Sequence, residues 1–175
     1  RGACAQACRL PYELIVDGQR RELGERAHLL GPVDLEASAL IPALVAAGVS
    51  SFKIEGRLKS PEYVAAATRL YREAVDAALE GRDAALAAWR HASAMSYSRG
   101  AGPGFLAGVD HQRLVDGKTN EHRGLEIGRA AGTRRQAGRT WLDVALTESL
   151  ARGDGLLVEG GFASQGEHGG VVWDL

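Results

Sequence analysis

The stretch from Val49 to Val64, V-S-S-F-K-I-E-G-R-L-K-S-P-E-Y-V, contains the strongest structural signals in the chain. Val49 to Ile54 is a short, mostly apolar and β-branched run before a glycine, which is typical of a buried parallel strand. Ser60 is a favourable N-cap, and Pro61 suits the first helical position after it. The sequence therefore predicts a strand that leads into a long helix, which ends at Gly81.

The segments on either side predict further elements of an α/β fold. Residues 12–23 contain an Asp-Gly pair between two β-forming runs, which indicates a hairpin. Asp34 can cap a helix over residues 35–47, in which Pro42 would cause a bend or a late start. A short Ala-rich helix is predicted over residues 83–91. Helix, strand and helix with short connections are typical of a right-handed parallel α/β unit.

A change of pattern predicts two domains. Residues 93–103, S-A-M-S-Y-S-R-G-A-G-P, are rich in Ser and Gly and indicate a linker. Residues 1–92 would form the first domain and residues 104–175 the second. The second contains short β-like runs between Gly-rich or Arg-rich turns, which suggests a small antiparallel barrel or sandwich. These runs are Gly124–Ala131, Thr140–Leu146, Gly155–Glu159 and Gly170–Trp173.

The composition is that of an ordinary globular protein. The chain has 175 residues, with 21 basic against 22 acidic side chains and 45% hydrophobic residues. These values argue against wholesale disorder, a coiled coil and a basic nucleic-acid-binding tail. No stretch approaches the roughly 18 uninterrupted apolar residues of a membrane-spanning helix, so we expect a cytoplasmic protein without membrane contacts. The only methionine is Met95, which predicts that the chain is part of a longer protein.

Cys4 and Cys8 are the only cysteines, and they lie four positions apart in R-G-A-C-A-Q-A-C-R. A disulfide is disfavoured in a cytoplasmic protein, which leaves inert thiols or ligands. Two nearby thiolates can hold half of an iron–sulfur cluster or half of a zinc site. Arg1 and Arg9 flank the pair, and their charge would favour thiolates. The spacing alone leaves both interpretations open, and structural thiols are the commoner outcome.

Lys53, Glu55 and Arg57 alternate along the predicted strand exit, so their side chains would share one face. The carboxyl end of a parallel strand is where α/β folds build active sites. Lys and Arg can hold an anion, while Glu can orient them or move a proton. The three residues are therefore candidates for a substrate site. A charged strand exit whose side chains pair with their neighbours is an equally good interpretation.

Other motifs carry weaker signals. A basic cluster in the β-rich part could contact RNA phosphates, although a solvated hairpin is the commoner outcome; its members are Arg129, Arg134, Arg135 and Arg139. His122 could bind phosphate but more often such a residue completes a turn. The H-E-x-x-H, G-x-S-x-G and phosphate-loop patterns are absent, so the chain contains no recognisable protease apparatus.

Three blocks together resemble peptidase family U32, the collagenase-like peptidases. They are R-G-A-C-A-Q-A-C-R, H-L-L-G-P-V-D-L and S-F-K-I-E-G-R-L-K-S-P-E-Y-V, in the order and spacing of that family over residues 1 to about 80. From Gly104 to Ala131, G-F-L-A-G and N-E-H-R-G-L-E-I-G-R are similar to the small C-terminal β-domain of the longer members.

The resemblance implies an α/β chain that holds the C-terminal portion of a TIM-type barrel, followed by a small antiparallel β-rich domain. It implies hydroxylation of a base in ribosomal RNA or tRNA, with RNA as the partner and an iron–sulfur cluster on four cysteines. Cys4 and Cys8 match two of those four, and Lys53 to Arg57 match a segment near the active site of the family. We expect this fragment alone to be inactive.

Two alternative functions stay open. A collagenase-like peptidase of the same family would cleave a peptide substrate. Residues 104–175 could instead form a non-catalytic module that binds RNA or protein.

Overall fold

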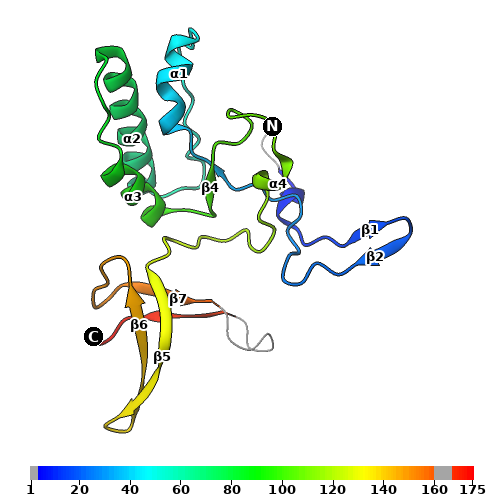
Figure 1. The fold of residues 1–175 in the computed structure, drawn as a ribbon, viewed down its shortest axis with the longest axis vertical. Coiled ribbons are helices and arrows are strands. Elements are labelled where there is room, and N and C mark those ends of the chain that lie inside the picture. The colour runs from blue at the N-terminus through cyan, green and yellow to red at the C-terminus, as the bar shows by residue number, and fades with distance from the viewer. Residues whose placement is uncertain (1–3, 160–166) are drawn as a thin grey trace. The chain divides into compact units, whose positions relative to one another are not determined.

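The computed structural model describes residues 4–159 and 167–175, and the chain forms two compact units that divide between Leu125 and Glu126 (Figure 1). In the described residues every helix lies in the first unit, and the second consists of strands β5 to β8. No helix in this part of the chain is both long and apolar enough to cross a membrane.

The long helix α2 (Pro61–Glu80) confirms the strongest prediction from the sequence. Ser60 caps it, since its hydroxyl oxygen accepts a hydrogen bond from the Tyr63 amide at 3.3 Å. Gly81 ends it in the left-handed conformation, with φ 67°. The helix packs against α1 (Ile41–Ala46) and α3 (Ala87–Ser96). Its buried face consists of four alanines and one leucine, which are Ala66, Ala67, Leu70, Ala74 and Ala77.

The prediction of a strand over Val49–Ile54 is wrong, because this segment has no regular secondary structure. β-branched composition alone cannot make a strand, since a strand needs a neighbour to satisfy its backbone groups. The parallel pairing in the first unit occurs elsewhere, between β3 (Asp34–Leu35) and β4 (Ala101–Gly102). The chain is therefore α/β, with its parallel strands at different positions from the predicted one.

The predicted helix over residues 35–47 begins later than expected. Residues 34 and 35 belong to β3, and the 3-10 helix η2 (Ser38–Leu40) precedes α1. Pro42 lies in the first turn of α1, where the missing amide costs nothing, so the predicted late start is confirmed. The helix predicted over residues 83–91 is α3, which lies slightly further along the chain.

The predicted linker, residues 93–103, contains the end of α3 and strand β4. Residues beyond the predicted linker also form hydrogen bonds with the N-terminal part of the chain. The Leu114 carbonyl accepts from the Val33 amide at 3.0 Å, and the Gly117 carbonyl accepts from His28 at 2.9 Å. These bonds explain why the compact units divide after Leu125. The short helix α4 (His111–Leu114) also belongs to the first unit.

The remaining strands form local antiparallel hairpins. The Asp-Gly hairpin is confirmed as β1 (Leu14–Val16) and β2 (Gln19–Arg21), with both turn residues at positive φ. In the second unit β5 (Gly128–Gln136) pairs with β6 (Arg139–Leu146), and β7 (Gly155–Val158) pairs with β8 (His168–Val171). Each sheet has two strands in the described residues, so the predicted barrel or sandwich does not close here.

We expect Leu70→Ala to destabilise the protein strongly. Leu70 is 2% exposed on the inner face of α2, and removing its branched end leaves a cavity. The expected loss in the free energy of unfolding is about 2 to 5 kcal/mol, measured by denaturant unfolding. Leu79→Ala is the matched control, because Leu79 lies on the same helix but is 66% exposed, and it should change stability by less than about 0.5 kcal/mol. Equal effects of the two substitutions would contradict the packing described.

Candidate functional site

The cysteine turn, residues 4–9, presents both thiols of the chain at the surface. Cys4 and Cys8 are exposed and free, and Cys8 lies in the 3-10 turn η1 (Ala7–Arg9). Gln6, between them, has a left-handed φ of 53°, and its amide donates to the Cys4 Sγ at 3.4 Å. N–H···S bonds of this kind tune the thiolates that bind metal clusters. The turn therefore offers two sulfur donors for a thiophilic metal group.

The two thiols fit half of a four-cysteine ligand set. The chain has no other cysteine. Within residues 4–159 and 167–175, no three His, Cys, Asp or Glu side chains gather closely enough to hold a metal ion. A four-cysteine site that included Cys4 and Cys8 would therefore need two further thiolates from outside this chain. Arg1, which we expected to flank the pair, lies outside the described residues.

Asn120 connects the cysteine turn to other segments of the first unit. Its Nδ2 donates to the Arg9 carbonyl at 2.8 Å and lies 2.7 Å from His28 Nδ1, which must be the acceptor because an amide nitrogen only donates. Gly31 is buried beside it, and a Cβ there would lie 2.1 Å from Asn120 Oδ1 and 3.3 Å from the Cys8 carbonyl oxygen. Motifs far apart in the sequence thus meet at the cysteine turn.

The Asp34–Arg99 ion pair lies next to this turn. Asp34 Oδ1 accepts from Arg99 Nε at 3.1 Å, and its Oδ2 accepts from the Arg99 amide at 3.0 Å. The two side chains are only 28% and 15% exposed. Hydrogen bonding to Asp34 raises the pKa of Arg99, with a smaller electrostatic contribution from Cys8.

A group of aromatic and cationic side chains surrounds Tyr97. The Lys59 Nζ lies 2.9 Å from the centre of the Tyr97 ring, and the Arg99 guanidinium carbon lies 5.9 Å from it. The His122 ring stacks on Tyr97 at 5.5 Å between centroids, and Tyr63 meets it edge-on at 6.1 Å. We call these five residues the Tyr97 cluster. Cation–π contacts of this kind stabilise a positive charge beside an aromatic face.

The protonation of the Tyr97 cluster follows from its hydrogen bonds. His122 Nδ1 accepts from the Ser98 amide at 2.9 Å and from the Gly124 amide at 3.3 Å, so its proton is on Nε2 in the neutral form. Burial, followed by the charge of Asp34, raises the pKa of Tyr63, which keeps its hydroxyl protonated at neutral pH. The cluster thus combines cationic side chains with flat ring surfaces, which suits a planar, anionic ligand.

An open hollow adjoins the Tyr97 cluster at the start of α2. Its volume is about 560 Å³, and its lining residues are Lys59, Pro61, Val64, Ala65, Thr68 and Arg69. Lys59 therefore contacts the Tyr97 ring and also lines this hollow. A ligand there would meet a mostly apolar wall and two cationic side chains, Lys59 and Arg69.

The predicted site residues Lys53, Glu55 and Arg57 lie on an exposed segment. Lys53 Nζ is 3.6 Å from Glu55 Oε2, and the two side chains are 87% and 70% exposed. Glu55 Oε1 accepts from the Arg57 amide at 3.1 Å. This bond, and then the charge of Lys53, lowers the pKa of Glu55. The Lys53 and Glu55 side chains are thus in contact, and Arg57 joins them through its backbone amide. The part of the three residues in substrate binding stays a prediction.

The sequence-based prediction missed Lys59, Tyr97 and Arg99. Lys59 lies in the same stretch as Lys53, Glu55 and Arg57 but outside their alternating pattern. Its position next to Ser60 identifies it only as part of the start of the helix. Tyr97 and Arg99 lie in the Ser- and Gly-rich stretch that we interpreted as a linker. The only sequence signal for a functional role was the presence of an aromatic and a basic residue within this stretch. His122 was interpreted as a turn residue, and its stacking on Tyr97 depends on contacts between residues 25 positions apart in the chain.

We expect Asn120→Asp to loosen the cysteine turn. The substitution keeps the size and shape of the side chain but removes the Nδ2 donor to Arg9 and His28. Backbone amides of residues 6–10 should then exchange with deuterium about tenfold faster, which corresponds to roughly 1.4 kcal/mol of lost local stability. Thr119→Val is the matched control, since Thr119 bonds only to the nearby Glu121 amide at 3.1 Å. Unchanged exchange in Asn120→Asp would exclude the proposed role of the amide.

We expect Lys53→Gln to raise the pKa of Glu55 toward its ordinary value of 4.5 without reaching it, because the stronger effect comes from the Arg57 amide. A carboxyl group with a lowered pKa adds stability above about pH 4.5, and this contribution disappears as the pH falls through the lower pKa of the folded state. Titration of the Glu55 carboxyl carbon by NMR measures the change. Lys118→Gln serves as the control, and an equal shift in both variants would contradict the local contact.

Comparison with known proteins places this geometry in context. The chain is 38% identical over 173 residues to the 23S rRNA 5-hydroxycytidine C2501 synthase of Escherichia coli, covering 90% of this chain and 24% of that protein. It is 37% identical over 116 residues to a collagenase of Porphyromonas gingivalis, covering 65% and 31%. It is 40% identical over 82 residues to tRNA hydroxylation protein P1 of Bacillus subtilis, covering 44% and 19%. The chain thus spans a third or less of the length of each.

No solved structure matches the chain. The sequence profile of Peptidase family U32 matches residues 1–116, which is more than half of the chain and includes both the cysteine turn and the Asp34–Arg99 ion pair. Together with the relatives above, this match shows that the chain belongs to Peptidase family U32.

Proposed function

We propose that this chain is part of an enzyme that hydroxylates a base in ribosomal RNA or tRNA. The observation that carries the proposal is the 38% identity to the 23S rRNA synthase, which runs through 90% of this chain and hence through both compact units. The similarity to the tRNA hydroxylation protein supports the same class of substrate. Because the chain spans only 24% of the synthase, we assign the activity to a full-length protein.

The Tyr97 cluster has the chemistry that RNA binding requires. Bases stack on aromatic rings, and each stack contributes about 1 to 3 kcal/mol. His122 is exposed, and its ring stacks on the Tyr97 ring. Lys59 can attract a phosphate that flanks a stacked base. We therefore propose that this cluster positions a segment of the RNA substrate.

We further propose that Cys4 and Cys8 are two of the four ligands of an iron–sulfur cluster. Such a cluster would supply electron transfer. The chain's own contribution would be to hold and orient the two thiolates: Gln6 bonds to the Cys4 sulfur, and Asn120 fixes the turn that contains Cys8. The charge of Arg99 would offset part of the negative charge that the thiolates bring.

We also propose that the first unit belongs to a TIM-type barrel. Its support is the parallel pair β3 and β4, since helices α1 to α3 lie between these two strands in the chain. Parallel strands connected through helices are the repeating unit of such barrels, whose active sites lie at the carboxyl ends of the strands. Residues 36–40 and 103–104 directly follow β3 and β4 and would lie at that face.

A collagenase-like peptidase is the second candidate function. It is favoured by the 37% identity to the Porphyromonas gingivalis collagenase over 116 residues. The two functions differ in what the full-length protein should process, a base in RNA or a peptide bond. Mass spectrometry of digested RNA for a hydroxylated nucleoside, alongside a gelatin-cleavage assay, separates them. Gelatin cleavage without any hydroxylated nucleoside would favour the peptidase.

We expect Lys59→Gln in the full-length protein to lower kcat/KM for RNA hydroxylation by roughly ten- to a hundredfold, mainly through a higher KM. The reason is that a lost charge-assisted hydrogen bond to phosphate costs about 1.5 to 3 kcal/mol of binding. Lys118→Gln removes an exposed charge from the same unit and should leave kcat/KM unchanged. Tyr97→Phe retains the ring and should also be active, whereas Tyr97→Leu should not. Full activity of Lys59→Gln and Tyr97→Leu would remove the Tyr97 cluster from the site.

We expect Cys4→Ser and Cys8→Ser each to lower the iron content of the anaerobically purified full-length protein by more than half. Each substitution removes one thiolate of the proposed ligand set, and the visible absorption near 400 nm, roughly where such clusters absorb, should fall in parallel. Gln6→Gly is the matched control, since it lies between the two cysteines and glycine adopts the left-handed conformation without strain. Unchanged iron content in both serine variants would show that the thiols are not ligands.

A further inference from the structure

The β5–β6 hairpin concentrates the positive charge of the second unit. Four of the five basic side chains in residues 126–175 lie on its two strands, and they are Arg129, Arg134, Arg135 and Arg139. The strands themselves contain a single acidic residue, Asp143, whereas the unit as a whole has seven acidic residues. The charge is therefore separated within the unit, with a basic arm on an otherwise acidic body.

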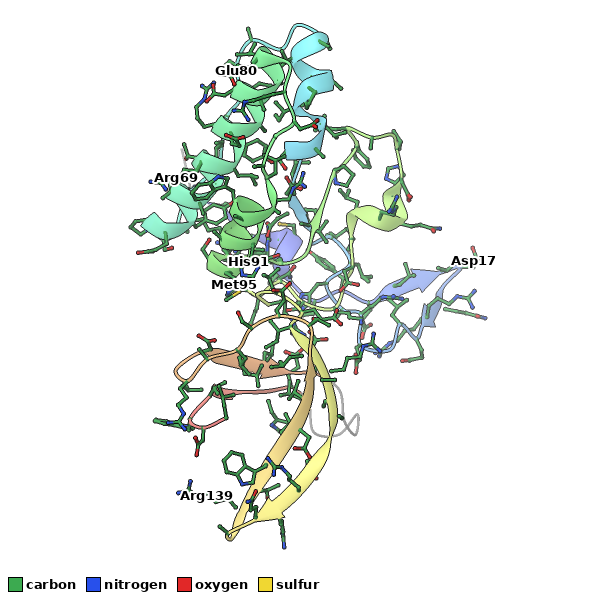
Figure 2. The ribbon with its side chains drawn as sticks, turned by 60° about the vertical axis from the view of Figure 1, so that its left-hand side comes forward. Asp17, Arg69, Glu80, His91, Met95 and Arg139 are labelled. Atoms are coloured by element: carbon green, nitrogen blue, oxygen red, sulfur yellow. The ribbon has the colours of Figure 1, made fainter. Side chains whose placement is uncertain are left out.

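The arm is long, and its first strand is exposed along nearly its whole length. Every residue of β5 after Gly128 is exposed. The ladder continues to the pair Gln136–Arg139, where Ala137 and Gly138 have φ 51° and 76° and make a tight turn that follows the twist of the strands. Eight paired residues give an arm of roughly 25 Å. Figure 2 shows Arg139 at the end of this arm.

Two of the arginines have structural partners. Arg134 donates from Nε to Asp143 Oδ1 at 3.0 Å, and its guanidinium lies 5.7 Å from the centre of the Trp141 ring. These contacts brace the two strands against each other. Arg129 is 3.9 Å from Glu126, but both side chains are almost fully exposed, so this pair contributes little.

The other two arginines, at the tip, are unpaired. Among the described residues, the guanidinium groups of Arg135 and Arg139 make no hydrogen bond, ion pair or cation–π contact. Arg135 lies opposite Thr140, and Arg139 lies opposite Gln136 in the adjacent pair. Because successive pairs of a ladder point to opposite faces, these two side chains leave the tip on opposite sides. A narrow two-stranded arm thus ends in two cations that face apart.

We propose that the tip of the β5–β6 hairpin inserts into a groove of double-helical RNA, where Arg135 and Arg139 contact phosphates of the two opposing strands. A guanidinium pairs with phosphate in a two-pronged geometry and does not require a particular base. Two cations on opposite faces match a groove, which has phosphates on both sides, better than a single strand. The proposal deepens the proposed function, on which its choice of RNA as the partner rests.

The test measures binding of the 175-residue chain to a fluorescein-labelled RNA duplex of 20 base pairs, by fluorescence anisotropy at several salt concentrations. The double variant Arg135→Gln with Arg139→Gln should bind about tenfold more weakly at 100 mM salt, and the slope of log K against log salt should fall by roughly 1.5. The matched control, Arg129→Gln with Arg152→Gln, also removes two exposed charges from this unit, and it should keep both values.

Equal binding by the two double variants would overturn the proposal, and so would equally tight binding of a single strand of the same sequence. A large fall in the melting temperature of the full-length protein with Arg135→Gln and Arg139→Gln would show that the arm packs against protein instead. The proposed function is tested separately: loss of duplex binding with intact RNA hydroxylation contradicts the arm alone. Duplex binding through the tip without any hydroxylation contradicts the proposed function and leaves the arm in place.

Discussion

The ion pair between Asp34 and Arg99 connects the segments on which the rest of the first unit depends. The two residues are 65 positions apart, and the carboxylate bonds to both the guanidinium and the backbone amide of Arg99. A partly buried pair is expensive to break, because the remaining charge is left without its partner. The pair therefore holds β3 beside β4 and fixes where Arg99 and Tyr97 lie. Without this connection, the cysteine turn and the Tyr97 cluster would have no common framework.

The structure separates two kinds of chemistry within this framework. The cysteine turn offers sulfur donors at the surface, and a neutral amide, Asn120, orients it. The Tyr97 cluster offers rings and cations, which suit a nucleic acid better than a neutral peptide. The arm in the second unit adds a third feature, two arginines at the end of a two-stranded hairpin. The proposed roles of these three features, in metal binding, base stacking and phosphate binding, are mutually consistent with the proposed function.

Local signals allowed part of the fold to be predicted correctly. Ser60, Pro61 and Gly81 define the ends of α2, because capping depends on residues only a few positions apart. The hairpin at Asp17–Gly18 follows from its turn residues in the same way. The strand at Val49–Ile54 failed because pairing is a property of two segments, and composition describes only one. The predicted linker failed for a related reason, since the partners of residues 97–102 are distant in the chain.

The sequence by itself determined the local elements, the family and the candidate cysteines, since each of these depends on residue types at short spacing. It also placed Lys53 and Glu55 together, because they are two positions apart. Only the tertiary structure decided that Asn120 meets Arg9 across 111 positions, and that His122 stacks on Tyr97. Contacts at such separations arise when the backbone brings segments together through hydrogen bonds and burial, and neither partner carries a local sequence signal for the other.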